Sequence, residues 1–364
     1  MKQKNKSLAL IALVLVVAAL GAALVFLNGL EEEEDPGLPL FGLDAADITG
    51  ISYQKADDEI DVTLLKQDGA WTLTSDPALP LDQDYVGTVG GNIAGLTAVR
   101  ELDPGELSGE DLGFDQPAMV LHLALNGADP AATGESAADV YTLTVGAENT
   151  VTDACYAKAS WTDRLYTIAS EDLVNLCRTP RQLYEEQAIT SLEEDDLTAM
   201  TVEMPGETLD FRYDADAGAW TLADDPDYAL DQNIVTKMAA TVCALKSQWT
   251  ITAPQADSAY GLDAPEAVVT LTGADGTSVT ASFGATTPDD DSASYLRAST
   301  APDVVYEIDA DNLAAYAYTK ATLQAATPET ATGEDAAEYT KPFLLPRAPA
   351  LGLFICLPSW YNDR

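Results

Sequence analysis

Alternating apolar and polar positions recur in two stretches of the chain and predict two sets of β-strands. In the first stretch the alternation predicts strands at residues 48–54, 60–66, 70–74, 119–125, 141–145, 156–160 and 165–168. Helical spacing instead predicts an amphipathic helix, with Asp82 or Asp84 as its N-cap. Its apolar face consists of Val86, Val89, Ile93 and Leu96. A second helix is expected over residues 170–177.

The same pattern returns 149 positions later. The segment Gly69-Ala70-Trp71-Thr72-Leu73 corresponds to Gly218-Ala219-Trp220-Thr221-Leu222, and Leu81-Asp82-Gln83 corresponds to Leu230-Asp231-Gln232. Further strands are expected at residues 268–272, 278–283, 295–298 and 304–308, with helices around Val235, Met238, Val242 and Leu245 and over 310–317. A repeat of this length indicates two copies of one domain. Each copy alternates β-hairpins with two helices, so the predicted class is α+β with mainly antiparallel sheets.

An apolar run precedes both copies. From Leu8 to Leu27 the chain has 20 apolar residues without interruption, enough for a helix of about 30 Å, the thickness of a hydrocarbon core. Lysines lie before this run and acidic residues 31–35 follow it, which predicts a cytoplasmic N-terminus and an exported remainder. A cleaved signal peptide is the alternative, but its apolar region is typically about 7–15 residues. The length therefore favours a retained single-pass anchor in the cell membrane.

These patterns divide the chain into six predicted parts. They are a cytoplasmic tip with a transmembrane helix (1–30), an acidic linker (31–42), the first α+β repeat (43–178), a connector (179–191), the second repeat (192–318) and a tail of uncertain structure (319–364). Residues 341–364 are largely apolar but contain several prolines, so they are too short and interrupted to span a membrane. A membrane-contacting or partner-binding tail and a shifted reading frame both remain open for this end.

The net charge of −42 sets the class of partner. Such an acidic surface repels nucleic acid and anionic lipid headgroups, and it favours cationic partners. Nucleic-acid binding is therefore excluded as a predicted function.

No catalytic, cofactor-binding or metal-binding residue is predicted. His122 is the sole histidine, and alternation places it on the solvent-facing side of its strand with Val120 and Ala124. Thr270 occupies the same place in the second copy, so the position does not require imidazole. Ser52 and Lys55 match a Ser-x-x-Lys pattern, but on a strand their side chains point to opposite faces.

Acidic, aromatic and thiol groups give no stronger prediction. Asp289-Asp290-Asp291 and the pair Asp214 and Asp216 lack the full ligand spacing of a calcium loop, and the second pair is expected in a hairpin turn. Trp71 and Trp220 are expected in the cores. The cysteines form no Cys-x-x-Cys pair, so zinc is not expected; they are Cys155, Cys177, Cys243 and Cys356. A Cys155–Cys177 bridge and independent buried thiols both remain open.

Two further segments suggest a family. Leu112-Gly113-Phe114-Asp115-Gln116-Pro117 is echoed by Tyr260-Gly261-Leu262-Asp263-Ala264-Pro265, and Leu173-Val174-Asn175-Leu176 precedes Arg181-Gln182-Leu183. Together with the apolar run, the acidic spacer and the tryptophan hairpin, they make residues 1–320 resemble the bacterial membrane-anchored family called domain of unknown function 4340. Members are often encoded beside ABC-2-type exporters and gliding-motility-like transport components. The resemblance implies an accessory role with an ABC-2-type permease or another envelope protein as partner, and it transfers no catalytic residue.

The expected function is a non-catalytic accessory or recognition module of an ABC-type transport or envelope complex, outside the cytoplasm. One alternative is an envelope hydrolase that uses acidic residues, with or without a metal. The other alternative is a structural spacer.

Overall fold

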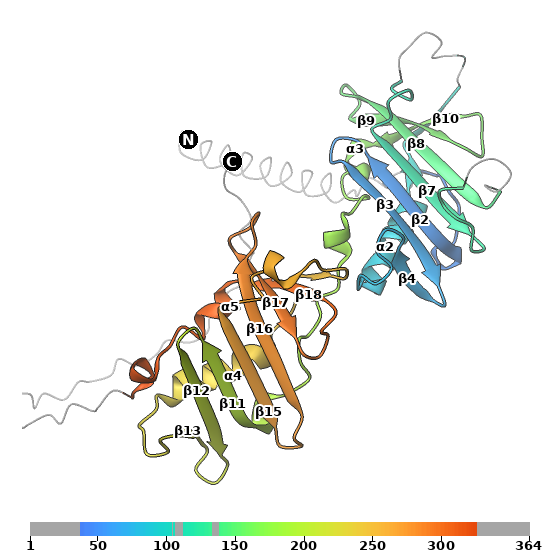
Figure 1. Ribbon diagram of the computed structural model, residues 1–364. Coiled ribbons are helices and arrows are strands. Elements are labelled where there is room, and N and C mark those ends of the chain that lie inside the picture. The colour runs from blue at the N-terminus through green and yellow to red at the C-terminus, as the bar shows by residue number, and fades with distance from the viewer. Residues whose placement is uncertain (1–36, 104, 106–111, 133–137, 326–364) are drawn as a thin grey trace, which may run out of the picture. The chain divides into compact units, whose positions relative to one another are not determined.

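The computed structural model describes residues 37–103, 105, 112–132 and 138–325 (Figure 1). They form two eight-stranded antiparallel sheets with a few short helices, which confirms the predicted mainly antiparallel class. The expected membrane helix from Leu8 to Leu27 and the apolar end of the tail, 341–364, lie outside the described residues. Within the described ranges, no helix combines the length and the apolar character needed to cross a membrane.

The first sheet has the strand order β4-β3-β2-β7-β8-β9-β10-β6. Its strands are β2 (Ile48–Lys55), β3 (Ile60–Gln67), β4 (Ala70–Leu73), β6 (Arg100–Leu102), β7 (Met119–Leu125), β8 (Val140–Asn149), β9 (Ala154–Ala159) and β10 (Leu165–Ala169). Helix α2 (Gln83–Ala94) lies between β4 and β6 in the sequence, which are the two edge strands. The helix therefore carries the chain from one edge of the sheet to the other, across one face.

The second sheet repeats this topology strand for strand, in the order β13-β12-β11-β15-β16-β17-β18-β14. Its strands are β11 (Leu197–Met204), β12 (Glu207–Asp214), β13 (Ala219–Leu222), β14 (Trp249–Ile251), β15 (Ala267–Gly273), β16 (Ser278–Thr286), β17 (Ala293–Ala298) and β18 (Val305–Asp309). Helix α4 (Gln232–Ala244) occupies the place of α2 and contacts β13 and β15.

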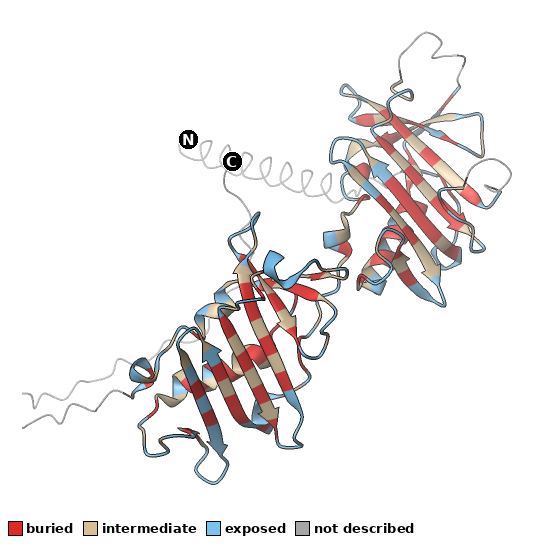
Figure 2. Cartoon of the chain, in the orientation of Figure 1, coloured by how far each residue is buried: buried red, intermediate tan, exposed pale blue. Residues whose placement is uncertain are grey.

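Each sheet has its core on the helix side. Burial alternates along the strands, as the red and tan bands of Figure 2 show. In the first sheet Tyr53, Leu121 and Leu123 are fully buried with Val86 and Ile93 of α2. In the second, the corresponding core combines strand residues with Val235, Met238 and Val242 of α4. Among the described residues no comparable helix covers the outer face of either sheet, so strand burial follows the period of two that the sequence shows.

The hydrophobic periodicity of the sequence did not predict two short edge strands. β6 and β14 each contain three residues and pair antiparallel with β10 and β18. Three residues are too few to show alternation, so their pairing is set by the chain leaving the helix at that edge. A further two-residue pair, β1 (Leu38–Pro39) with β5 (Thr97–Ala98), was also not predicted.

The two closing helices are shorter than expected. α3 covers Ser170–Leu173 and α5 covers Asp311–Ala314, against predicted spans of 170–177 and 310–317. Neither has a side-chain hydrogen bond at its N-cap. The apolar residues that follow α3 continue to pack, since Leu176 and Cys177 are buried, but they do so outside regular helix.

A 3₁₀ turn returns the chain to the main helix after each sheet. The turns are η4 (Pro180–Leu183) and η7 (Lys320–Leu323), each with a capping box made by Thr179 or Thr319. The Asp82 N–H donates to the carbonyl of Leu183 at 2.9 Å, and the Asp231 N–H donates to that of Leu323 at 2.8 Å. These bonds tie the end of each sheet's segment to the start of α2 or α4.

Candidate functional site

The repeated Leu-Asp-Gln segment connects the main helix to the tryptophan strand. Asp82 caps α2 by accepting a hydrogen bond from the Tyr85 N–H at 2.8 Å, and Asp231 caps α4 through the Asn233 N–H at 3.0 Å. The next residue is a glutamine whose side-chain amide binds the backbone of the tryptophan on both sides. Gln232 accepts from the Trp220 N–H at 2.8 Å and donates to the Trp220 carbonyl at 2.9 Å. Both roles build the fold, so this motif contributes no group for chemistry.

Replacing Gln232 by alanine is expected to destabilise the protein by about 1–2 kcal/mol, because two hydrogen bonds to the edge strand β13 are lost. Urea unfolding followed by circular dichroism measures the change. The matched control is Gln248→Ala, an exposed position at which no appreciable change is expected. Equal effects of the two substitutions would contradict this role for Gln232.

The repeated Gly-x-Asp-x-Pro segments pack backbone against backbone on the sheet. Gly113 and Gly261 have positive φ, +76° and +69°. Gly146 lies at a bulge in β8 where a Cβ would overlap the Leu112 carbonyl oxygen, and the neighbouring Ala147 N–H donates to that oxygen at 2.8 Å. Gly284 meets the Tyr260 carbonyl in the same way. This second family-like motif is therefore also structural.

A groove lies beside this contact in the first repeat. We call it the first groove; its volume is about 480 Å³, and it is bounded by the end of β2, the start of β7, the β8 bulge and α3. Met119, Leu173 and Val174 form its apolar part. Its polar side chains come from separate segments of the chain: Lys55, Asp57, Gln116, Glu148, Cys155 and Ser170.

Three of these polar groups form a connected cluster. The Ser170 hydroxyl donates to Glu148 Oε1 at 2.7 Å, and Ser170 Oγ lies 3.7 Å from Cys155 Sγ. Burial raises the pKa of the Cys155 thiol, and the Ser170 hydrogen bond opposes this only in part. The thiol is thus held in its protonated, weakly nucleophilic form, which does not suit covalent catalysis. The arrangement can accept hydrogen bonds and attract a positive charge.

The second repeat has a groove at the equivalent place. This second groove, of about 420 Å³, is lined by Met204, Pro205, Leu313 and Tyr316, by one carboxylate, Glu266, and by several alanines. Thr286 stands at the position of Glu148 and Ala310 at that of Ser170. Ser294 replaces Cys155, and its buried hydroxyl has no hydrogen-bond partner within the described part of the chain. The polar cluster is therefore a property of the first repeat alone.

Of the residues singled out in the sequence, His122 and Ser52 do not line the first groove, whereas Lys55 does. His122 is half-buried on the sheet face opposite α2, with Nδ1 2.9 Å from Thr142 Oγ1, and burial lowers its pKa. It is thus less solvent-facing than the alternation suggested. Ser52 bonds Thr63 at 3.1 Å, whereas Lys55 forms an ion pair with Asp58.

The predicted aspartate loops act as turns. Asp214 accepts hydrogen bonds from the N–H groups of Asp216 and Ala217, as expected for a hairpin turn. Asp290 accepts from the Ser292 N–H and hydroxyl, at 2.9 and 2.6 Å. Over the described ranges, histidine, cysteine and acidic side chains form no group of three able to hold a metal. Trp71 and Trp220 are buried in their cores, as predicted.

Among the described cysteines, Cys155, Cys177 and Cys243 are all free thiols, so the structure contains no Cys155–Cys177 bridge. Cys356 lies outside the described residues. Burial raises the pKa of each thiol, and that of Cys177 reaches about 12.

These shifts predict slow alkylation. With a folded pKa of about 12 against 9 as the ordinary value, Cys177 stays protonated between pH 9 and 11 while the unfolded thiol ionises. The unfolded state then binds fewer protons than the native state, so stability falls as pH rises above about 9. Iodoacetamide labelling followed by mass spectrometry at pH 8 and 10 should find Cys177 protected in the native protein and labelled in urea. Fast native labelling at pH 8 would contradict this.

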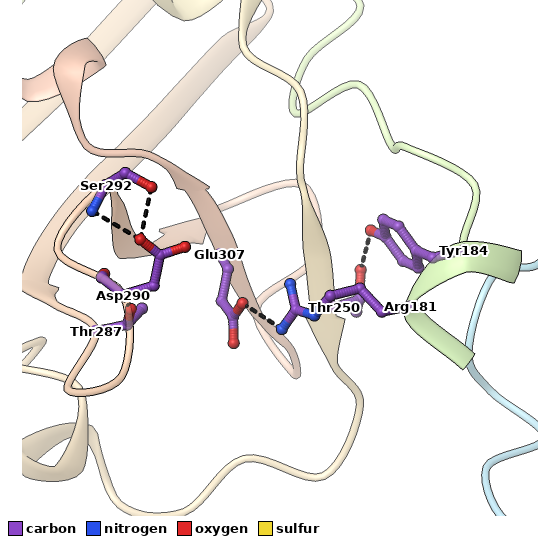
Figure 3. A network of polar contacts seen from close by, with 7 residues as sticks. All are labelled: Arg181, Tyr184, Thr250, Thr287, Asp290, Ser292 and Glu307. Carbon is purple, nitrogen blue, oxygen red and sulfur yellow. Dashed lines mark hydrogen bonds and ion pairs between the residues drawn. The ribbon is translucent and has the colours of Figure 1, made fainter. Parts of the chain in front are cut away.

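The connector that follows the first sheet forms a polar network with the second sheet (Figure 3). Arg181 Nη2 lies 2.7 Å from Glu307 Oε2 of β18, and its guanidinium lies 4.9 Å from the Trp249 ring centre. The Tyr184 hydroxyl is 2.6 Å from Thr250 Oγ1 of β14 and also bonds Ser247. Sequence reasoning found no function for these residues because the contacts join segments more than 60 positions apart.

The comparisons with known proteins give a family and no function. No curated protein and no solved structure matches the chain. A family model described as "Domain of unknown function (DUF4340)" matches in two tandem segments, residues 71–219 and 220–339. The two matches begin at the equivalent residues Trp71 and Trp220. Each match therefore starts within one structural repeat and ends within the segment that follows it. Since these segments cover most of the chain, it belongs to the family of domain of unknown function DUF4340, which it contains twice.

Proposed function

We propose that this chain is a membrane-anchored, extracytoplasmic accessory protein whose two repeats recognise a partner in an ABC-type transport or envelope complex. The proposed anchor is the apolar run from Leu8 to Leu27, which is long enough to span a bilayer and has lysines before it and acidic residues after it. No enzymatic reaction is assigned to the repeats.

The proposal is supported by a difference in role between the residues that recur in both copies and the residues that diverge. The motifs that recur in both copies cap helices, form hydrogen bonds with an edge strand or allow close backbone contact. The grooves, which lie at the same place in both copies, have different linings. A scaffold kept constant while its concave surface varies is typical of a recognition module, because binding specificity resides in a few polar groups placed around an apolar pocket.

The test is isolation of the complex. The tagged full chain is extracted from its native membranes with mild detergent, purified and analysed by mass spectrometry. A multi-spanning transport protein should be recovered with it in reproducible proportion, and a variant lacking residues 8–27 should lose both membrane association and this partner.

Two outcomes would contradict the proposal. One is repeated recovery of the chain alone, even after chemical cross-linking in intact cells. The other is release of soluble fragments when the purified chain is incubated with cell-envelope glycan or peptide, since this would support the hydrolase alternative.

A further inference from the structure

The first groove has a carboxylate that the protein itself does not neutralise. Glu148 is an exposed residue of the groove's lining, and its carboxylate accepts a hydrogen bond from the uncharged hydroxyl of Ser170, at 2.7 Å. Among the ion pairs formed between described residues, none includes Glu148. Lys55, the one lysine in the groove's lining, forms its ion pair with Asp58 and not with Glu148. Asp57 adds a second carboxylate to the lining.

The groove also has an apolar lining. Its residues Met119 and Leu173 are buried, while Val174 keeps 63% of its surface exposed. A large exposed aliphatic residue next to a cavity is a site where a ligand's hydrocarbon part removes apolar surface from water. The volume of about 480 Å³ lies within the range usual for small-ligand pockets.

We propose that the first groove binds a primary ammonium group carried on a short alkyl chain, such as a lysine side chain or a free alkylamine. The ammonium donates hydrogen bonds to Glu148, and the alkyl chain lies against Met119, Leu173 and Val174. Ser170 fixes the Glu148 carboxylate by donating to Oε1, which leaves Oε2 for the ligand. The net charge of −42 raises the local concentration of cations around the protein and adds to this selectivity.

The second repeat serves as an internal comparison. Its groove has nearly the same volume and one carboxylate, Glu266, but Ala310 takes the place of Ser170, and no serine or threonine lines the groove. The Tyr316 hydroxyl also lines this groove, but it donates to the Met238 carbonyl at 2.9 Å, so no hydroxyl of the lining positions Glu266. The carboxylate positioned by a hydroxyl therefore belongs to the first repeat, and n-butylammonium should bind the first groove more tightly than the second.

This inference rests on the proposed recognition function and names the chemistry that the first repeat recognises. The experiment uses the full chain in detergent with methyl-labelled valine, leucine and methionine, titrated with n-butylammonium and followed by NMR. The Val174, Leu173 and Met119 methyl signals should shift with a saturable, millimolar dissociation constant. n-Butanol, which lacks the charge, should bind more weakly. Addition of 0.5 M salt should weaken the binding of n-butylammonium.

Two variants distinguish binding at the first groove from general attraction of cations by the acidic surface. Glu148→Gln should weaken n-butylammonium binding about two- to fivefold, the range expected for one exposed charge pair. Glu171→Gln removes the same charge from exposed α3 without touching the groove, and it should leave the affinity unchanged. Equal weakening by both variants, or equal affinities read from the methyl signals of Leu173 and Leu313, would overturn the proposal.

The source of the ammonium is resolved by a second probe. N-acetyl-lysine-N-methylamide places the same group on a peptide unit, and tighter binding than n-butylammonium assigns the site to peptide lysines; weaker binding assigns it to free amines. If membrane isolation still recovers a transport partner while neither probe shifts the groove signals, this inference fails and the proposed function stands.

Discussion

Replacing Gly146 by alanine is expected to destabilise the first repeat by about 3 kcal/mol or more. The added Cβ would overlap the Leu112 carbonyl oxygen and would also press on the Phe114 ring. The obstacle is backbone, which cannot move away as the end of a flexible side chain can. Relief would require the bond from the Ala147 N–H to the Leu112 carbonyl to break, together with the bulge that β8 makes there.

Urea unfolding followed by circular dichroism measures this effect. Gly87→Ala is the control, because a Cβ at Gly87 meets nothing within 4 Å and the position is inside α2. Alanine there should stabilise the protein by about 0.5–1 kcal/mol, since it favours helix more than glycine does. The equivalent Gly284→Ala should act on the second repeat as Gly146→Ala acts on the first. A tolerated Gly146→Ala would show that the backbone contact does not hold the motif.

These glycines show how far the sequence could lead. The recurrence of Gly113 and Gly261 was visible, but the residues they approach, Ala147 and Ala285, lie more than 20 positions later. Strand positions such as Met119–Leu125 followed directly from alternation, because each strand buries one face only. Close backbone contact leaves no periodic signal. The structure was therefore needed to explain why these glycines recur.

The candidate site was beyond the sequence for a related reason. Lys55, Glu148, Cys155 and Ser170 come from segments whose proximity depends on the order of strands in the sheet. β2 lies next to β7 because α2 carries the chain across the face of the sheet before β7 begins. No residue pattern in the sequence predicts this pairing. The correspondence of Glu148 to Thr286 is likewise not given by the 149-residue repeat, because the loop before β8 is longer in the first copy and changes the offset.

Replacing Trp220 by alanine is expected to cost about 3–5 kcal/mol, the usual range for removing a large aromatic side chain from a core. Trp220 is 4% exposed, and its ring centre lies 5.2 Å from that of Tyr213. Its backbone is held by Gln232, so the strand cannot easily shift to fill the cavity. Trp220→Phe retains part of the buried ring and should cost less than half as much.

The Trp220→Ala variant also tests whether the two cores are energetically independent. Trp220 belongs to the core of the second sheet, and its equivalent Trp71 belongs to that of the first. Hydrogen exchange followed by mass spectrometry should therefore show faster exchange in β11–β18 and unchanged protection in β2–β10, with Trp71→Ala giving the reverse. Uniform loss of protection in both sheets would mean that the repeats unfold as one cooperative unit, because a local cavity would then lower the stability of all strands together.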